Sequence, residues 1–110
     1  MTPQSNEAMS DFPGAELVLP GLDDLAAGRL TIGSCLVSMA RPNMDRAGLT
    51  SSLPTARFVL EPERTLYRLL QAEGGNAYGR YNSLRRRLVK FERALRHRAS
   101  GTHGQASVAS

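Results

Sequence analysis

The stretch 76–98, NAYGRYNSLRRRLVKFERALRHR, decides the fold that this sequence predicts. An α-helix brings residues spaced by alternating steps of four and three onto one side, whereas a strand alternates its side chains between two faces. Apolar residues of the stretch follow that spacing, at Ala77, Tyr81, Leu84, Leu88, Phe91 and Leu95. We therefore expect one amphipathic helix about 35 Å long. The five larger residues, named the seam below, are expected to pack in a core or against a partner: Tyr81, Leu84, Leu88, Phe91 and Leu95.

Most of the positive charge belongs to the same predicted helix. Residues 76–98 hold seven Arg and Lys90 against Glu92, a net charge of +7, whereas residues 1–75 hold six Arg and nine acidic residues, a net charge of −3. The whole chain of 110 residues therefore carries +4. Helical spacing places the basic residues on the back of the helix and along its sides. This basic ridge comprises Arg85, Arg86, Arg87, Lys90, Arg93, Arg96 and His97.

The basic ridge has two interpretations that the sequence leaves open. It is either a surface that binds an anion, such as a nucleic-acid backbone, or a solvated face that is neutralised within the fold. Acidic residues that could neutralise it lie at Asp23, Asp24, Glu61, Glu63 and Glu73.

Three shorter helices are predicted before the long one. The first spans 22–27, between Pro20-Gly21 and Gly28, and the second spans 32–41 behind Thr31 as its N-cap. The third begins at Glu61-Pro62-Glu63, because proline and acidic residues favour a first helical turn, and Gly74-Gly75 ends it. Residues 49–60 are expected to be a loop or an extended segment that docks Phe58, Val59 and Leu60 onto the core.

These elements predict an all-α fold, a small bundle of three to four helices with a long C-terminal amphipathic helix. We expect a disordered N-terminal arm at 1–15, a single helical domain at 16–98 and a disordered C-terminal tail at 99–110. The chain has no run of 18 apolar residues, and its first residues lack the charge and apolar pattern of a secretory signal. A cytoplasmic location is therefore expected, and membrane binding is not.

No group of residues predicts catalysis. Cys35, the one cysteine, shares an apolar helix face with Ile32 and Leu36 and is interpreted as a core residue. His97 and His103 are too far apart, and too poorly supported by acids, to suggest a metal site. The glycines of 74–79 lack the spacing of a phosphate-binding loop. We therefore predict a protein that is not an enzyme, with no cofactor, no metal and no evident small-molecule substrate.

The residues Arg80-Tyr81-Asn82-Ser83-Leu84, Arg86-Arg87-Leu88-Val89 and 91–95 form the pattern RYNxLxRRLVxFERAL. It resembles the C-terminal signature of a group of small bacterial proteins of unassigned function. The resemblance implies a small helical bacterial protein and brings no activity or cofactor with it.

Two functions are compatible with these observations. The first is a non-enzymatic helical module for protein–protein interaction or regulation, in which the seam contacts another protein or a second copy in a homodimer. The alternative is a nucleic-acid-binding protein that uses the basic ridge. The two differ in which face of the long helix is free.

Overall fold

The computed structural model describes the backbone of residues 11–109 and the side chains of residues 11–98. Within that range the helices are α2 (Ala15–Ala27), α3 (Ile32–Met39), α4 (Arg41–Arg46), α5 (Pro62–Glu73) and α6 (Ala77–Ala109). A 3₁₀ turn, η1 (Thr55–Arg57), lies in the connection between α4 and α5, and no strand occurs in the described backbone. The predicted all-α fold class is confirmed.

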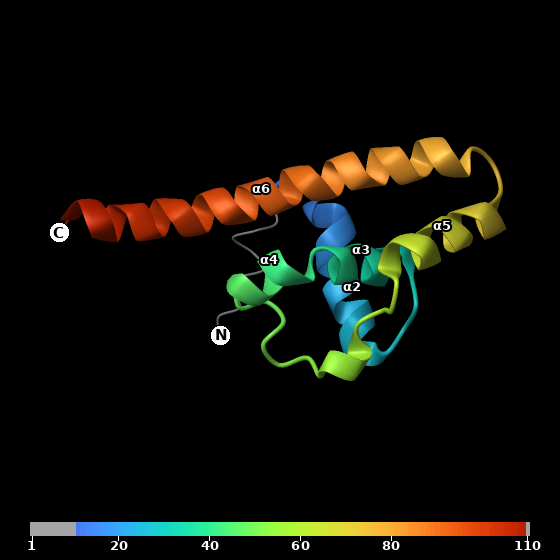
Figure 1. The fold of residues 1–110 in the computed structure, drawn as a ribbon, viewed down its shortest axis with the longest axis horizontal. Helices are drawn as coiled ribbons and strands as arrows, with labels where there is room; N and C mark the ends of the chain where they lie inside the picture. Colours follow the sequence, from blue (N-terminus) through green and yellow to red (C-terminus); the bar gives the residue numbers. More distant parts are fainter. Residues whose placement is uncertain (1–10, 110) are drawn as a thin grey trace.

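Helix α6 runs along the length of the molecule, and the other helices lie on one side of it (Figure 1). The molecule measures 53 × 28 × 23 Å, and α6 accounts for the long dimension because 33 residues of helix extend about 50 Å. Its C-terminal end continues past the other helices (Figure 1). In the described part of the chain, no helix is both long enough and apolar enough to cross a membrane.

Helix α2 is longer than the sequence predicts, because the Pro20-Gly21 pair lies inside it and does not start it. The helix begins at Ala15, directly after Gly14, whose positive φ of 84° suits glycine. Gly21 is buried where α2 crosses α3, and a Cβ atom there would lie 2.3 Å from the carbonyl oxygen of Gly33. The glycine thus permits two backbones to approach, a role that the residues around it in the sequence do not reveal.

The folded domain also starts earlier than predicted. Phe12 packs on the core, and its ring meets that of Phe91 edge to face at 5.9 Å between centroids. Residues 11–15 of the predicted arm therefore belong to the folded part, and residues 1–10 lie outside the described residues. At the other end α6 continues to Ala109, beyond Arg98, where the sequence predicts that it ends. The glycines in that stretch are single, unlike the Gly74-Gly75 pair. A single glycine destabilises a helix by about 1 kcal/mol relative to alanine, which need not end it.

The predicted starts of α3 and α5 are confirmed. The Thr31 hydroxyl accepts a hydrogen bond from the Ser34 backbone N–H, and the Ser34 hydroxyl accepts one from the Thr31 backbone N–H, which forms a capping box. Pro62 occupies the first turn of α5, and Gly74 follows its last residue. A short helix, α4, follows α3 almost directly.

The loop before α5 docks two of its three predicted apolar residues. Phe58 and Val59 pack on the core, where the Arg41 guanidinium lies 4.1 Å from the Phe58 ring centroid and the Val59 N–H donates to the Ser38 hydroxyl at 2.9 Å. Leu60, in contrast, is 86% exposed, which corrects the expectation that it docks. Once its two predecessors are held against α3 and α4, Leu60 points to solvent.

The seam of α6 lies in the chain's own core. Leu88, Phe91 and Leu95 are buried, and Tyr81 and Leu84 are half-buried against them. The Tyr81 ring meets that of Tyr67, from α5, edge to face at 5.7 Å. This packing orients α6, because it turns the opposite side of the helix toward solvent.

Candidate functional site

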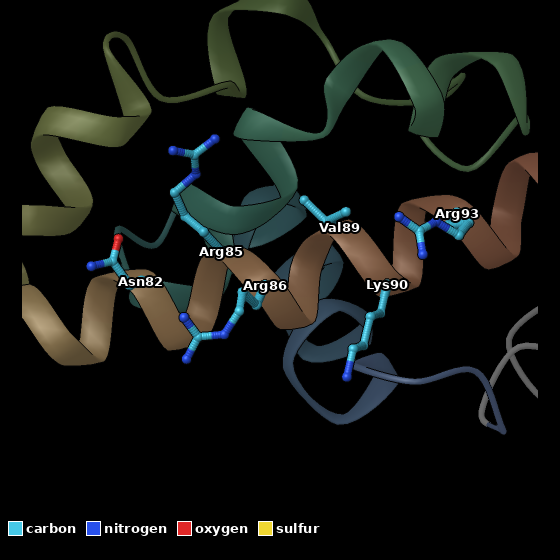
Figure 2. A pocket seen from close by; sticks show the side chains of 6 residues that line it. All are labelled: Asn82, Arg85, Arg86, Val89, Lys90 and Arg93. Carbon is cyan, nitrogen blue, oxygen red and sulfur yellow. The ribbon is translucent and has the colours of Figure 1, made fainter.

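The side of α6 that faces away from the core carries a shallow hollow of about 390 Å³. Its walls are long polar and basic side chains around Val89 (Figure 2). Arg96 and His97, both exposed, continue this side by one turn. We name it the outer face, and it comprises Asn82, Arg85, Arg86, Val89, Lys90, Arg93, Arg96 and His97.

The acidic residues of the other helices form their ion pairs away from the outer face. Asp24 pairs with Arg29 at 3.0 Å and Glu61 with Arg64 at 3.4 Å, both within the α2–α5 part of the chain. Another pair joins Arg41 and Asp45 of α4. Of the five acids proposed from the sequence to neutralise the ridge, Asp24 and Glu61 are therefore engaged elsewhere. Asp23 and Glu63 form no ion pair within residues 11–98.

Only two basic residues of α6 form ion pairs with the described carboxylates. Arg80 pairs with Glu73 of α5 at 2.8 Å, and Arg87 pairs with Glu16 of α2. At about 100° per residue, Arg80 and Arg87 lie on the same side of α6, roughly midway between the seam and the back of the helix. The structure thus separates Arg87 from the rest of the predicted basic ridge.

The remaining basic residues keep their charge unpaired within residues 11–98. No carboxylate of that range lies within 4.0 Å of the charged groups of Arg86, Lys90, Arg93 and Arg96. Glu92, the acid of α6 in that range, instead accepts a hydrogen bond from the Asn43 side-chain amide at 2.9 Å. The outer face therefore presents at least four positive charges to solvent.

Arg85 has a different environment from the other outer-face arginines. Its guanidinium lies 5.9 Å from the ring centroid of Tyr81, and Tyr81 in turn packs against Tyr67. Such cation–π contacts are worth about 0.5–1 kcal/mol at exposed sites. Arg85 is thus partly held at the edge of the outer face that lies nearest α5.

Two residues of the outer face, Asn82 and Val89, are not among the predicted site residues. Asn82 is half-buried and Val89 is 40% exposed, and both line the hollow beside Arg86 and Lys90. The helical wheel places both on the same side as the basic residues, but an analysis that selects charge passes over them.

A second hollow, of about 660 Å³, lies between α2, α3 and α5. Its floor is mostly apolar, and three carboxylates stand around it, from Glu16, Asp24 and Glu73. Each of the three already forms an ion pair with an arginine of the same chain. This hollow therefore offers an apolar surface without an unpaired charge.

The titratable groups of the described core do not form a reactive centre. Burial raises the pKa of Cys35 to about 11, so its thiol stays protonated at neutral pH. A hydrogen bond from Thr31, and then one from Arg29, lower the pKa of Asp24. Among the described side chains, no three His, Cys, Asp or Glu residues gather as metal ligands would.

Comparison with known proteins adds no assignment, because no family model, curated protein or solved structure matches this chain.

Proposed function

We propose that this chain binds nucleic acid through the outer face of α6, and that phosphates of the nucleic-acid backbone take the place of the missing carboxylates. The observation that carries the proposal is that Arg86, Lys90, Arg93 and Arg96 form no ion pair with a carboxylate of residues 11–98, where every ion pair involves another arginine. Phosphate contacts by arginine and lysine supply most of the affinity in sequence-independent binding.

Electrostatic repulsion makes such a face costly when nothing is bound. Arg86 and Lys90 lie four residues apart, and Lys90 and Arg93 lie three apart, so neighbouring side chains carry the same charge. Each such pair destabilises a helix by a few tenths of a kcal/mol, and an anionic ligand removes that cost. The burial of the seam supports the same proposal, because it leaves the basic side of α6 as the accessible one.

The alternative, a protein–protein module that associates through the seam, has less support. Leu88, Phe91 and Leu95 already pack within this chain, so a partner that binds the seam would have to displace the core of this chain. Docking of α6 on a lipid surface meets the same difficulty, because an interfacial helix inserts its apolar side.

The proposal is tested by the anisotropy of a labelled 20-base-pair duplex, titrated with protein between 50 and 200 mM salt. With four phosphates neutralised, the slope of log K against log salt is expected to be about −3.6, which corresponds to a loss of affinity of about 150-fold. The double variant Arg86→Gln/Lys90→Gln should make the slope less steep by about 1.8.

The matched control is Arg29→Gln/Arg64→Gln, which removes the same charge from the body of the protein. It should retain the slope and most of the affinity, since neither residue lies on the outer face. Absence of binding, or an equal loss in the control, contradicts the proposal. A protein recovered from nuclease-treated lysate in place of nucleic acid supports the alternative.

A further inference from the structure

The side chains of the outer face fall into three strips along α6, of which the two lateral ones are basic and the middle one is mixed. At about 100° per residue, Asn82, Val89 and Arg93 lie within about 40° of one another around the helix axis and form the middle strip. The basic side chains lie at larger angles on either side of it and form two lateral strips. Lateral side chains extend to opposite sides of the helix, Arg85 to one side and Arg86 and Lys90 to the other (Figure 2). The middle strip is Asn82, Val89 and Arg93, and the lateral strips are Arg85 with Arg96, and Arg86 with Lys90 and His97.

We propose that α6 enters the major groove of duplex DNA, with the middle strip against the base edges and the lateral strips against the phosphates of the two strands. This inference rests on the function proposed above and specifies its ligand. The major groove of B-DNA is about 12 Å wide and admits an α-helix. A helix seated there has a phosphate backbone on each side, which matches the two basic lateral strips.

The middle strip holds side chains that are able to distinguish base pairs. An asparagine amide pairs with adenine, an arginine fork pairs with guanine, and an apolar side chain contacts the thymine methyl group. Asn82 and Arg93 are eleven residues apart, or about 16 Å along the helix. At 3.4 Å per base pair, this distance covers about five base pairs.

The middle strip is available for such contacts without rearrangement of the core. Neither the Asn82 amide nor the Arg93 guanidinium forms a hydrogen bond with another side chain or backbone group among the residues described. Val89 is 40% exposed between them. The buried seam lies on the far side of the helix, so the packing of Leu88 and Phe91 is unaffected when the outer face is covered.

Other nucleic acids fit the strips less well. Proteins that bind single strands stack the bases on aromatic side chains, and near the outer face only Tyr78, at the start of α6, is an exposed aromatic residue in the described range. Double-stranded RNA has a major groove too deep and narrow for side chains to read. An acidic protein surface would not explain an uncharged asparagine and valine between two basic strips.

The first test compares duplex DNA, double-stranded RNA and single-stranded DNA of one sequence in the anisotropy assay, and then selects from a library of randomised DNA duplexes. We expect the DNA duplex to bind most tightly and the selection to enrich a site of about five base pairs. Equal affinity for the three forms, or no enriched site, overturns the inference but leaves the proposed function standing. Absence of binding to all three overturns both.

The second test uses variants that retain the net charge. Asn82→Ala and Arg93→Lys should each lower affinity for the selected duplex by about 5- to 140-fold, with the salt slope and the affinity for an unselected duplex unchanged. Arg86→Lys is the matched control in a lateral strip. It should leave the affinities for both duplexes and the salt slope unchanged, because either cation can contact a phosphate. Circular dichroism confirms that each variant retains its helix content. Equal effects of Arg93→Lys and Arg86→Lys contradict the assignment of the strips.

Discussion

Asp24, near the end of α2, forms side-chain hydrogen bonds with residues at the start of α3 and in the connection before it. Its carboxylate accepts hydrogen bonds from the Thr31 hydroxyl at 2.7 Å and from the Arg29 guanidinium at 3.0 Å. The same Thr31 oxygen accepts the backbone N–H of Ser34, so the ionised carboxylate also orients the N-cap of α3. These contacts lower the pKa of Asp24 below its ordinary value of 3.8.

The lowered pKa predicts a loss of stability in acid. Because the folded state holds the carboxylate ionised at a pH where the unfolded state takes up a proton, the contribution is present above about pH 3.8 and is lost as the pH falls through the lower folded value. Urea unfolding measures how far the free energy of unfolding falls between pH 7 and pH 3. This fall should be smaller for Asp24→Asn than for the wild type. Asp23→Asn, at the exposed neighbour, should behave as the wild type, and equal losses for all three contradict the prediction.

Individual residues also mark the limit of what the sequence predicts. The Thr31 cap and the stop at Gly74-Gly75 follow from local chemistry and were predicted correctly. Gly21 was misinterpreted, because its function depends on Gly33 in another helix, and no local pattern distinguishes a close-packing glycine from a helix breaker.

At the scale of the element, the two sides of α6 are predicted correctly although its end is not, because heptad spacing alone divides a buried side from an exposed one. Each residue of the seam is predicted from the sequence to pack either in a core or against a partner. In the structure the seam packs in the chain's own core. The candidate site was predicted less completely. Arg87 pairs with Glu16, 71 residues away in the sequence, so its separation from the unpaired arginines required the tertiary structure.

Leu88 and Val89 are adjacent in α6 and provide a direct test of its two sides. Leu88 is 4% exposed in the core and Val89 is 40% exposed on the outer face. Leu88→Ala should lower the free energy of unfolding by about 2–5 kcal/mol, since it leaves a cavity. Val89→Ala should change it by less than about 0.5 kcal/mol. Urea titrations followed by circular dichroism measure both, and similar losses in the two variants would show that α6 is rotated from the orientation described.

At the scale of the whole molecule, the net charge of +4 hides an uneven distribution. Those carboxylates of the α2–α5 part that form ion pairs do so with arginines of that part, or with Arg80 and Arg87 on one side of α6. The surplus positive charge of residues 76–98 therefore lies on α6, which runs along one edge of a molecule 53 Å long (Figure 1). A field with this asymmetry orients an approaching polyanion toward the outer face before contact.

The burial of the seam also predicts the state of the protein without ligand. Beyond Leu95 the next positions at seam spacing are Arg98, Thr102 and Gln105, so the apolar pattern ends where the other helices cease to cover α6. Along α6 a second copy thus finds no continuous apolar strip, and like charges on the outer face of two copies repel each other. Light scattering on the peak from a size-exclusion column should give a mass of 11.9 kDa, which is that of one chain. This mass should not change as the salt concentration is lowered. A mass near twice that value, which persists in Arg86→Gln/Lys90→Gln, would instead favour the homodimer of the protein–protein alternative.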